Sequence, residues 1–528
     1  MKSSYIKYVF IIFIVILIII AIYIIRKNEE EDKREKEYIE VNEEENQIRE
    51  IKLGIAEFDT INPILSNNKN VQDISKLIYD PLITLTQDYK AKSCLAVEWA
   101  REQNNSYIIK LKENVKWSSG QKFTAYDVKY TIDMLKQSQS IYKYNVQNII
   151  GVTVIDDYTI RIKLDKEIAF FEYNLTFPII SRDNFEGQDF FTSEKNKNPI
   201  GTGKYKIKDI QSSYIELEKN LNWWDKETKL NINKITVNLY SSIGELYNSF
   251  KLGNLDEIST ENPKIKDYIG TIGYNPKEIK GRNHTYLAIN TTNNILSRQE
   301  VRQAILYSID VNNIQNTLEN KVIQSDFPLD YGNGLYQNMR QDIRSNQEVA
   351  KQILVNNGWI YKNAYWQKTE NYKTNKIQFK LLVKSSDNEK TKVAENIKNQ
   401  LEIQGIRANI KLANDEEYYN LLDSRNYDIA LSEIILSPSP SLETFLGASN
   451  LANYNNIEVN NILEEVKNTK DESIIIEKYK RIIEIFNIEV PYISLYNNKL
   501  TVAYNSGLSG KISTNWFNQF YGIETWYK

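Results

Sequence analysis

The chain contains a single cysteine, Cys94, and a single histidine, His284, the residue types that most often supply nucleophiles, bases and soft metal ligands. A zinc site needs three or four His, Cys or carboxylate ligands, and a Ser or Cys nucleophile usually needs a histidine base. One residue of each type cannot supply these sets. We therefore interpret Cys94 as a buried thiol and His284 as an ordinary polar residue. We predict no metal site and no cofactor, and an intramolecular disulfide is excluded.

Two glycine motifs invite a chemical interpretation. In Gly201-Thr202-Gly203-Lys204 a phosphate-binding loop would also need a glycine at Asn198 and a hydroxyl residue at Tyr205, and neither is present. We interpret these glycines as a tight entry to a strand, and Trp117-Ser118-Ser119-Gly120 as a turn with a packed tryptophan. The chain also lacks the Gly-x-Ser-x-Gly and His-Glu-x-x-His motifs. The motifs predict no enzyme.

The elements that must position any site alternate between strands and helices. Residues 158–164 alternate apolar and polar side chains, which predicts a half-buried strand. Thr124 with Asp127, and Ser297 with Glu300, are predicted capping boxes. An apolar stripe at Val393, Ile397 and Leu401, and another over 473–487, predict two further helices. This mixture indicates an α/β protein with more than one sheet.

Composition supports a large folded body. The chain has 528 residues, of which 41% are hydrophobic and 26% charged, with a net charge of −3. This length suits two or three lobes, and the charge offers no basic excess for nucleic acid. We expect no nucleic-acid partner.

The amino terminus predicts a membrane anchor. Tyr8 to Ile25 contains no charge, and as a helix it would span about 27 Å, close to a bilayer core. Only Ala21 is small, so a cleavage site is missing and residues 1–25 are interpreted as an uncleaved transmembrane signal anchor. Residues 26–50 are rich in Glu, Lys and Arg and predict a solvated stalk. Counted alone, the basic residues after the anchor favour a cytoplasmic domain.

From Ile51 onward, motifs in a fixed order carry a family resemblance. They include FDTINPILSNN, ISKLIYDPLI, LKENVKWSSGQKFTAYDVKYTIDML, NPIGTGKYKI, LEKNLNWWD, GNLDEI, YLAIN, EVRQAILYSID, AKQILVNNGW, QLEIQGIRANI, NYDIALSE and VPYISLYNN. In this order the chain resembles family 5 of the bacterial extracellular solute-binding proteins, the oligopeptide-, dipeptide- and nickel-binding group. The resemblance covers nearly all of the chain beyond the stalk.

The resemblance implies a type II periplasmic-binding-protein fold of α/β class, with two lobes, a hinge, a cleft and an extra inserted domain. Its implied boundaries are 51–81, 185–288 and 500–528 for lobe I, 82–184 for inserted domain II, and 289–499 for lobe III. It also implies an extracellular domain that encloses ligand between the lobes and delivers it to the permease of an ABC importer.

The resemblance also suggests ligand-binding positions. It implies contacts with the peptide backbone at Asn67 and Lys69, and with a peptide carboxylate at Arg425. Four aromatic residues are predicted to wall the cleft: Tyr142, Tyr144, Trp516 and Phe517. Three more positions lie in the segment expected to contact the peptide amino terminus: Glu433, Leu436 and Ser437. Core packing is the alternative interpretation of each aromatic, and an exposed helix charge that of Arg425.

One segment departs from the family pattern. In SEIILSPSPSLETF, Ile434 stands near the expected tryptophan, and Leu436-Ser437 near the aspartate that pairs with a peptide's α-amino group. A buried ammonium without an anion is costly, so this segment favours ligands with a blocked or less charged terminus.

The predicted function is therefore capture of a short peptide, or a similar small solute, by a monomeric, membrane-anchored substrate-binding protein. Two alternatives stay open: a metal-chelate carrier of the nickel type, and a tethered peptide-sensing receptor. The many Tyr, Ile, Asn and Lys residues suggest an AT-rich genome and, with the anchor, a single-membrane, Gram-positive-type bacterium.

Overall fold

The computed structural model describes residues 27, 49–261, 273–336 and 345–528. The predicted anchor over 1–25 and nearly all of the predicted stalk lie outside these residues. Within the described part, no helix has both the length and the apolar composition that a bilayer crossing requires.

The first sheet has four strands in the order β1-β10-β9-β8. They are β1 (Glu50–Ala56), β10 (Lys234–Tyr240), β9 (Tyr214–Lys219) and β8 (Tyr205–Ile210), and β1 lies parallel to β10. Alternate residues of β1 are buried, as expected for a strand with one face on a core. Helices α2 (Lys69–Ile78) and α5 (Ile243–Lys251) pack beside this sheet.

The second sheet, also four-stranded, has the order β4-β5-β7-β6. Its strands are β4 (Ala96–Glu102), β5 (Ser106–Leu111), β7 (Thr159–Leu164) and β6 (Ile149–Asp156). Two more strands, β2 (Ile83–Leu85) and β3 (Ala91–Ser93), form a separate pair, and α3 (Ala125–Gln137) and α4 (Lys143–Val146) complete this region. The predicted strand at 158–164 is confirmed, as is the capping box that begins α3.

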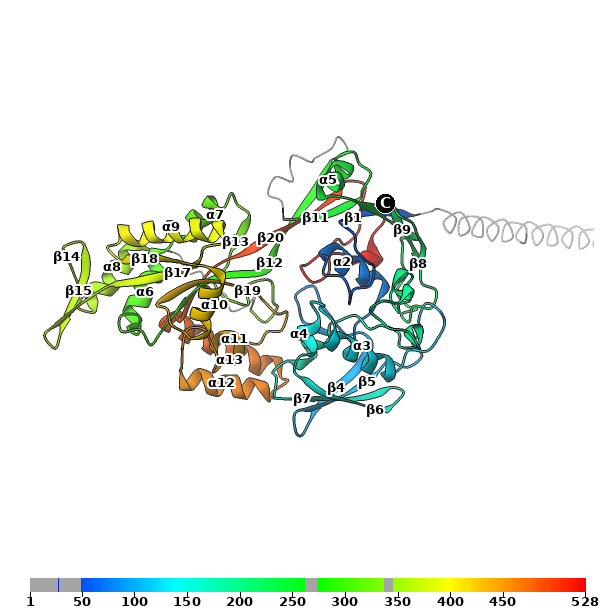
Figure 1. Cartoon of the computed structure of the whole chain (residues 1–528), viewed down its shortest axis with the longest axis horizontal. Helices are drawn as coiled ribbons and strands as arrows, with labels where there is room; N and C mark the ends of the chain where they lie inside the picture. The colour runs from blue at the N-terminus through cyan, green and yellow to red at the C-terminus, as the bar shows by residue number, and fades with distance from the viewer. Residues whose placement is uncertain (1–26, 28–48, 262–272, 337–344) are drawn as a thin grey trace, which may run out of the picture.

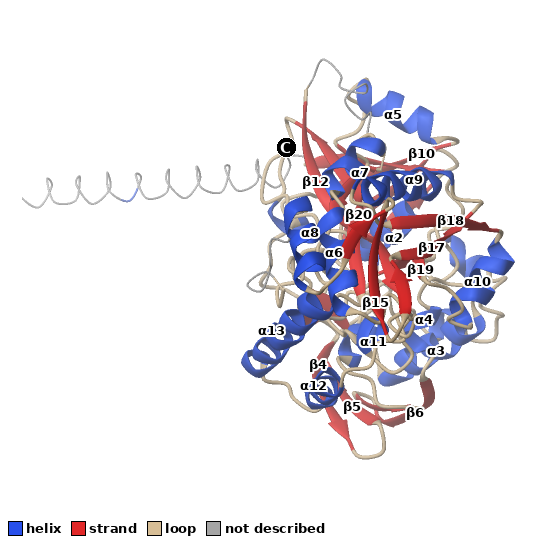
Figure 2. Ribbon diagram, turned by 90° about the vertical axis from the view of Figure 1, so that its left-hand side faces the viewer, coloured by secondary structure: helices blue, strands red, loops and turns tan. Residues whose placement is uncertain are grey.

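The largest sheet has seven strands. Six follow the order β11-β20-β12-β19-β17-β18, and β13 pairs with β20. In Figure 2, strands β17, β18, β19 and β20 lie between α6 and α8 on one side and α10 on the other. The strands are β11 (Glu257–Thr260), β12 (Tyr274–Ile289), β13 (Val322–Gln324), β17 (Gln378–Lys384), β18 (Arg407–Ala413), β19 (Ile429–Ile435) and β20 (Tyr492–Asn505).

Helices and a small sheet surround these strands. The helices are α6 (Gln299–Ser308), α7 (Val311–Thr317), α8 (Gln347–Asn356), α9 (Asn388–Ile403), α10 (Asp415–Asp423), α11 (Glu443–Leu446), α12 (Ile457–Lys467) and α13 (Glu472–Glu489). The small sheet consists of β14 (Ile360–Lys362), β15 (Tyr365–Glu370) and β16 (Lys373–Lys376). The predicted apolar stripe of α9 is buried, as is most of the stripe of α13.

Two long strands join the two halves of the molecule. In Figure 1, β12 and β20 run from the half that contains the first two sheets to the half that contains β17 and β18. They pair antiparallel from Tyr274 opposite Asn505 to Ala288 opposite Tyr492, with an irregularity between Lys280 and His284. We call the region where the halves meet around these strands the junction. The implied domain boundaries stay predictions. The sheet that contains β12 and β20 has strands on both sides of the boundary implied at residue 289.

One predicted cap is wrong. Helix α6 begins at Gln299 with Arg298 at its N-cap, and no side chain caps it. Ser297 instead donates to the Asn294 carbonyl at 3.2 Å. The preceding turn is closed by Asn293, whose Oδ1 accepts from the N–H groups of Ile295 and Leu296. Ser297 therefore belongs to that turn, and its hydroxyl is not available to α6.

Candidate ligand-binding site at the junction

Helix α2 presents charged side chains toward the junction. Its N-cap, Asn68, accepts from the Asn70 N–H and donates to the Ala56 and Glu57 carbonyls, which attaches the helix to the end of β1. Lys69, Asp73 and Lys76 follow at spacings of four and three, and residues at these spacings lie on one helix face. The sequence predicted Lys69 but not Asp73 or Lys76, although their helical spacing after Lys69 would have indicated them.

Asp73 is the anion that holds this face together. It is only 1% exposed and is ion-paired with Lys69, while its Oδ1 lies 3.3 Å from Lys76 Nζ. Burial lowers the pKa of Lys76 to about 8, opposed by the Asp73 carboxylate. Lys76 therefore stays mostly cationic at neutral pH.

A carboxyl-terminal segment covers α2. Lys76 donates to the Phe517 carbonyl and its Nζ lies 4.7 Å from the centroid of that ring, while Lys69 Nζ lies 5.6 Å from the Trp516 ring. The Trp516 N–H donates to the Tyr89 hydroxyl at 2.9 Å. Two of the predicted aromatics thus lie against the lysines of α2.

Tyr89 connects this cluster to the other half of the molecule. Its ring meets that of Tyr331 edge-to-face at 5.1 Å between centroids. Beside it, the Gly334 N–H donates to the Asp88 carbonyl at 2.9 Å. The turn between β2 and β3, the segment 331–336 and the carboxyl-terminal segment therefore meet at the junction.

Arg282 lies on β12, at the irregularity where the strand crosses between the halves. Burial lowers the pKa of its guanidinium, while the nearby Tyr331, Tyr89 and Tyr142 raise it. Its positive charge is also among those that lower the pKa of Lys76. No sequence motif marked Arg282, because its surroundings come from distant parts of the chain.

Tyr142 borders a cavity that reaches the same cluster. The cavity has a volume of about 210 Å³. Lys76 and Phe517 also line it, so it opens beside the lysine face of α2. Burial raises the pKa of Tyr142, with Asp73 contributing and Arg282 opposing. Its other lining residues include Tyr79, Asp80, Cys94, Lys204, Trp223 and Trp224.

A buried carboxyl lies near this face. Glu257 accepts both of its hydrogen bonds from Gln519 Nε2, at 2.5 and 2.7 Å. Burial raises the pKa of Glu257 to about 8, with the Asp73 charge adding to the effect. Glu257 is therefore mostly neutral at pH 7 and contributes little negative charge to the junction.

The segment at 433–437 borders Arg282. The Leu436 N–H donates to the Arg282 carbonyl at 2.8 Å, and the Leu436 side chain is buried. The Ser437 carbonyl accepts from the Tyr331 hydroxyl at 3.1 Å. Glu433 is ion-paired with Lys390 at 3.2 Å, so its charge is already matched.

The remaining three predicted positions are Asn67, Tyr144 and Arg425, and Asn67 directly precedes the N-cap of α2. Asn67 bonds the backbone of Gln139 and Ile141, between α3 and α4. Tyr144 is 74% exposed. Arg425 donates from all three guanidinium nitrogens to the carbonyls of Leu422, Asp423, Ser449 and Asn450. As arranged, Arg425 holds the end of α10 to a neighbouring loop. All ten predicted positions stay predictions.

Cys94 and His284 offer no reactive group at the surface. Cys94 is buried, and burial holds the pKa of its thiol well above the usual value. His284 is fully buried, with Nδ1 3.0 Å from Asn497 Oδ1 and Nε2 3.3 Å from Ser494 Oγ. Among the described residues, no group of three or more His, Cys, Asp or Glu is arranged to hold a metal ion.

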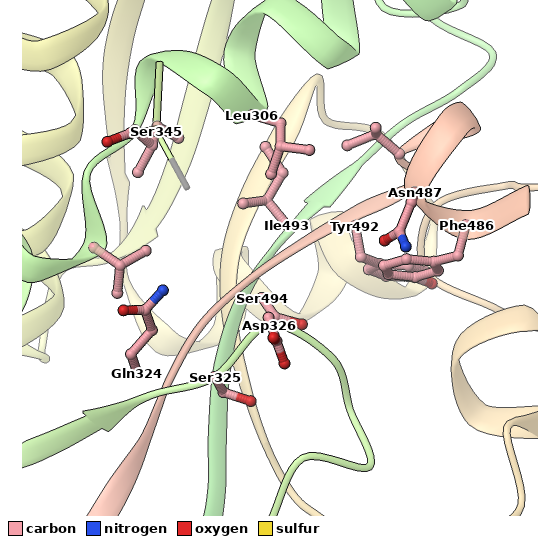
Figure 3. A pocket seen from close by; sticks show the side chains of 13 residues that line it. Leu306, Gln324, Ser325, Asp326, Ser345, Phe486, Asn487, Tyr492, Ile493 and Ser494 are labelled. Atoms are coloured by element: carbon pink, nitrogen blue, oxygen red, sulfur yellow. The ribbon is translucent and has the colours of Figure 1, made fainter. Parts of the chain in front are cut away.

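A further, smaller cavity of about 40 Å³ lies between β20 and the ends of α6 and α13. Figure 3 shows Gln324, Asp326, Asn487, Tyr492 and Ser494 around it. It shares no residue with the cluster around α2, and its volume would hold only water-sized molecules.

Comparison with known proteins identifies the family. The model of "Bacterial extracellular solute-binding proteins, family 5 Middle" matches residues 90–456. This chain belongs to family 5 of the bacterial extracellular solute-binding proteins. It is 23% identical over 482 residues to the dipeptide-binding protein DppE of Bacillus subtilis (strain 168), covering 82% of this chain and 83% of DppE.

Other similar proteins carry different names. The nickel-binding protein NikA of Staphylococcus aureus (strain NCTC 8325 / PS 47) is 23% identical over 427 residues, covering 79% of this chain and 82% of NikA. The crystal structure of a nickel ABC transporter from Bacillus halodurans superposes with a TM-score of 0.74 at 19% identity, covering 89% of this chain and 98% of that chain. The structural likeness shows the fold, which is the α/β fold of type II periplasmic-binding proteins. Family 5 consists of solute carriers rather than enzymes.

Proposed function

We propose that this protein is the substrate-binding component of an ABC importer and captures short peptides. The observation that carries the proposal is the junction of a family 5 fold, where α2, the β2–β3 turn, segment 331–336, Arg282 and the carboxyl-terminal segment converge. Polar, charged and aromatic groups from both halves meet there beside a cavity. Because these groups come from two halves joined by the paired strands β12 and β20, the halves can close around a ligand bound between them.

The proposal includes the domain organisation. Lobe I comprises 51–81, 185–288 and 500–528, inserted domain II comprises 82–184, and lobe III comprises 289–499. Residues 1–25 serve as a transmembrane signal anchor, the stalk over 26–50 follows, and the large domain is extracellular in a single-membrane bacterium. The protein acts as a monomer and passes its ligand to the permease. The apolar amino-terminal sequence and the family's extracellular or periplasmic role support this arrangement.

The metal-chelate alternative rests on the nickel-binding relatives. Direct histidine ligation has no support, because the only histidine is fully buried and its ring nitrogens face Asn497 and Ser494. A metal held by its own organic chelator would not need a histidine. A tethered sensing receptor would use the same peptide site without a permease.

The test is native mass spectrometry of the full-length protein, purified gently from its own bacterium in mild detergent. The expected result is a bound mass that fragments as a short peptide. A bound species with the isotope pattern of a transition metal would replace the peptide proposal by the chelate carrier. An empty protein that shows no thermal shift with peptide mixtures would refute the peptide proposal.

A further inference from the structure

Arg282 differs from every well-satisfied buried arginine in this fold. Its Nε is buried without a hydrogen-bond partner, and among the described residues no carboxylate pairs with its guanidinium. The residue as a whole is only partly buried. Leaving a buried cationic group without an acceptor costs free energy.

Arg302 shows how this chain satisfies a structural arginine. It is 5% exposed and donates to the carbonyls of Glu489, Leu296 and Ser297 at 2.6 to 2.9 Å. Arg425 is similarly occupied by four backbone carbonyls. Arg282 has neither arrangement, so scaffold support does not explain its position.

The charge around Arg282 is positive. Lys69 and Lys76 share the buried carboxylate Asp73, and Arg282 adds a third positive charge that acts on Lys76. Glu257 is mostly neutral at pH 7, and Glu261, which interacts with Lys69, accepts a hydrogen bond from Asn498. The neighbouring Lys280 is already neutralised by Asp330 at 2.8 Å. This balance leaves an excess of positive charge, which favours an anionic ligand group.

The only carboxylate of the adjoining segment, Glu433, is ion-paired with Lys390. The Leu436 N–H bonds the Arg282 carbonyl, and the neighbouring residues of 434–437 are Ile, Ile, Leu and Ser. A free ammonium would therefore meet Arg282 rather than a carboxylate. The positive charge in this part of the junction suits the carboxyl terminus of a peptide rather than its amino terminus.

Resting on the proposed function, we infer that Arg282 binds a carboxylate of the ligand, and that the protein selects short peptides by this group. A guanidinium matches a carboxylate with two parallel N–H···O bonds, which fixes the orientation of the ligand as well as adding affinity. Tyr89, Tyr142 and Tyr331 surround the pair, and Lys69 and Lys76 add favourable charge at longer range. The carboxylate comes from the peptide's carboxyl terminus or from an acidic side chain.

The experiment measures binding of synthetic two- to five-residue peptide pools to the full-length protein in mild detergent by calorimetry. One pool has free carboxyl termini and no acidic residue, a second is the same pool amidated, and a third is amidated but contains Asp or Glu. The free-acid pool is expected to bind roughly 10- to 100-fold more tightly than its amidated twin. Tight binding of the third pool would assign the carboxylate to a side chain.

Variants connect this preference to Arg282. Arg282→Gln is expected to remove the difference between free and amidated pools, and Arg282→Lys to retain part of it. Arg481→Gln removes the same charge from the exposed face of α13 and should leave the preference unchanged. Thermal unfolding of each variant checks the fold, and the comparison of pools on the unmodified protein needs no variant.

Two failures are distinguishable. If the unmodified protein binds all three pools equally well, including the amidated pool without acidic residues, the carboxylate inference is refuted while peptide capture stands. If it binds none of the three pools, peptide capture itself is refuted, and the inference with it.

Discussion

His284 lies in an environment unlike that of a histidine at a protein surface. Its ring is fully buried, stacked on Tyr286 at 5.6 Å between centroids, and its nitrogens face Asn497 and Ser494. Burial lowers the pKa of this imidazole from 6.5 to about 4. The folded protein therefore keeps His284 neutral in a pH range where the unfolded chain protonates it.

This difference predicts an acid-dependent loss of stability. Between pH 6.5 and 4 the unfolded state binds the extra proton, so the free energy of unfolding falls as the pH is lowered through this range. The expected loss is about 2 kcal/mol, and His284→Gln should remove this component of the pH dependence. Urea unfolding at pH 7 and pH 4.5, with variant and unmodified protein side by side, measures it.

Because His284 is the only histidine, its ring proton signals need no assignment by mutagenesis. With a purification tag free of histidine, the NMR signal of the folded protein should stay unshifted down to about pH 5. A titration midpoint near 6.5 would contradict the buried, neutral imidazole.

At the residue scale, burial could be predicted from residue type, whereas the ten binding positions stay predictions. Trp117 and Cys94 are buried as expected, because their types alone favour burial. Asp73 and Lys76 were predictable from their spacing after Lys69. Arg282 was not, because what distinguishes it is the absence of a partner, and that depends on segments far away in the chain.

At the element scale, the glycines before β8 show what close packing demands. A Cβ on Gly201 would lie 1.9 Å from the carbonyl oxygen of Ile78, at the end of α2. The neighbouring Gly203 donates its N–H to the same carbonyl at 2.8 Å. The sequence predicted a tight turn here. In the structure, glycine is needed at these positions because a side chain would clash with the end of α2, and not because the backbone is left-handed.

Gly201→Ala is therefore expected to destabilise the protein by about 3 kcal/mol, because the backbone of α2 must shift to admit a methyl group. Gly244→Ala is the matched control. Its Cβ would have no neighbour closer than 3.9 Å, and alanine favours the helix by up to about 1 kcal/mol. Chemical denaturation of both variants makes the comparison, and equal stabilities would contradict the contact with Ile78.

Elements with a clear period were predicted well, and caps less well. The strand at 159–164 and helix α9 follow their apolar patterns, because burial of one face dominates their energy. The same Ser/Thr-x-x-acidic pattern caps α3 at Thr124 but not α6 at Ser297. A neighbouring turn decides between these outcomes, and a four-residue pattern does not include it.

At the scale of the whole molecule, the order of motifs predicted the fold, but not how its parts meet. The contact from Trp516 to Tyr89 joins residues 427 positions apart, and the ring pair of Tyr89 and Tyr331 joins the two halves. Such contacts depend on the relative placement of whole sheets. Local periodicity carries no record of that placement.

Ligand capture by closure requires the two halves to move about β12 and β20. If ligand binds at the junction by closure, small-angle scattering should show the radius of gyration of the full-length protein in detergent falling by about 1 Å on saturation with a free-acid peptide that binds. At 100 times the dissociation constant, the same ligand should raise the free energy of unfolding by about 2.7 kcal/mol. An amidated peptide that does not bind is the control for both measurements. Stabilisation of this size without any change in the radius of gyration would indicate binding to a preformed surface. A ligand that acts by closure binds the closed state more tightly than the open state, and the closed state brings the halves together.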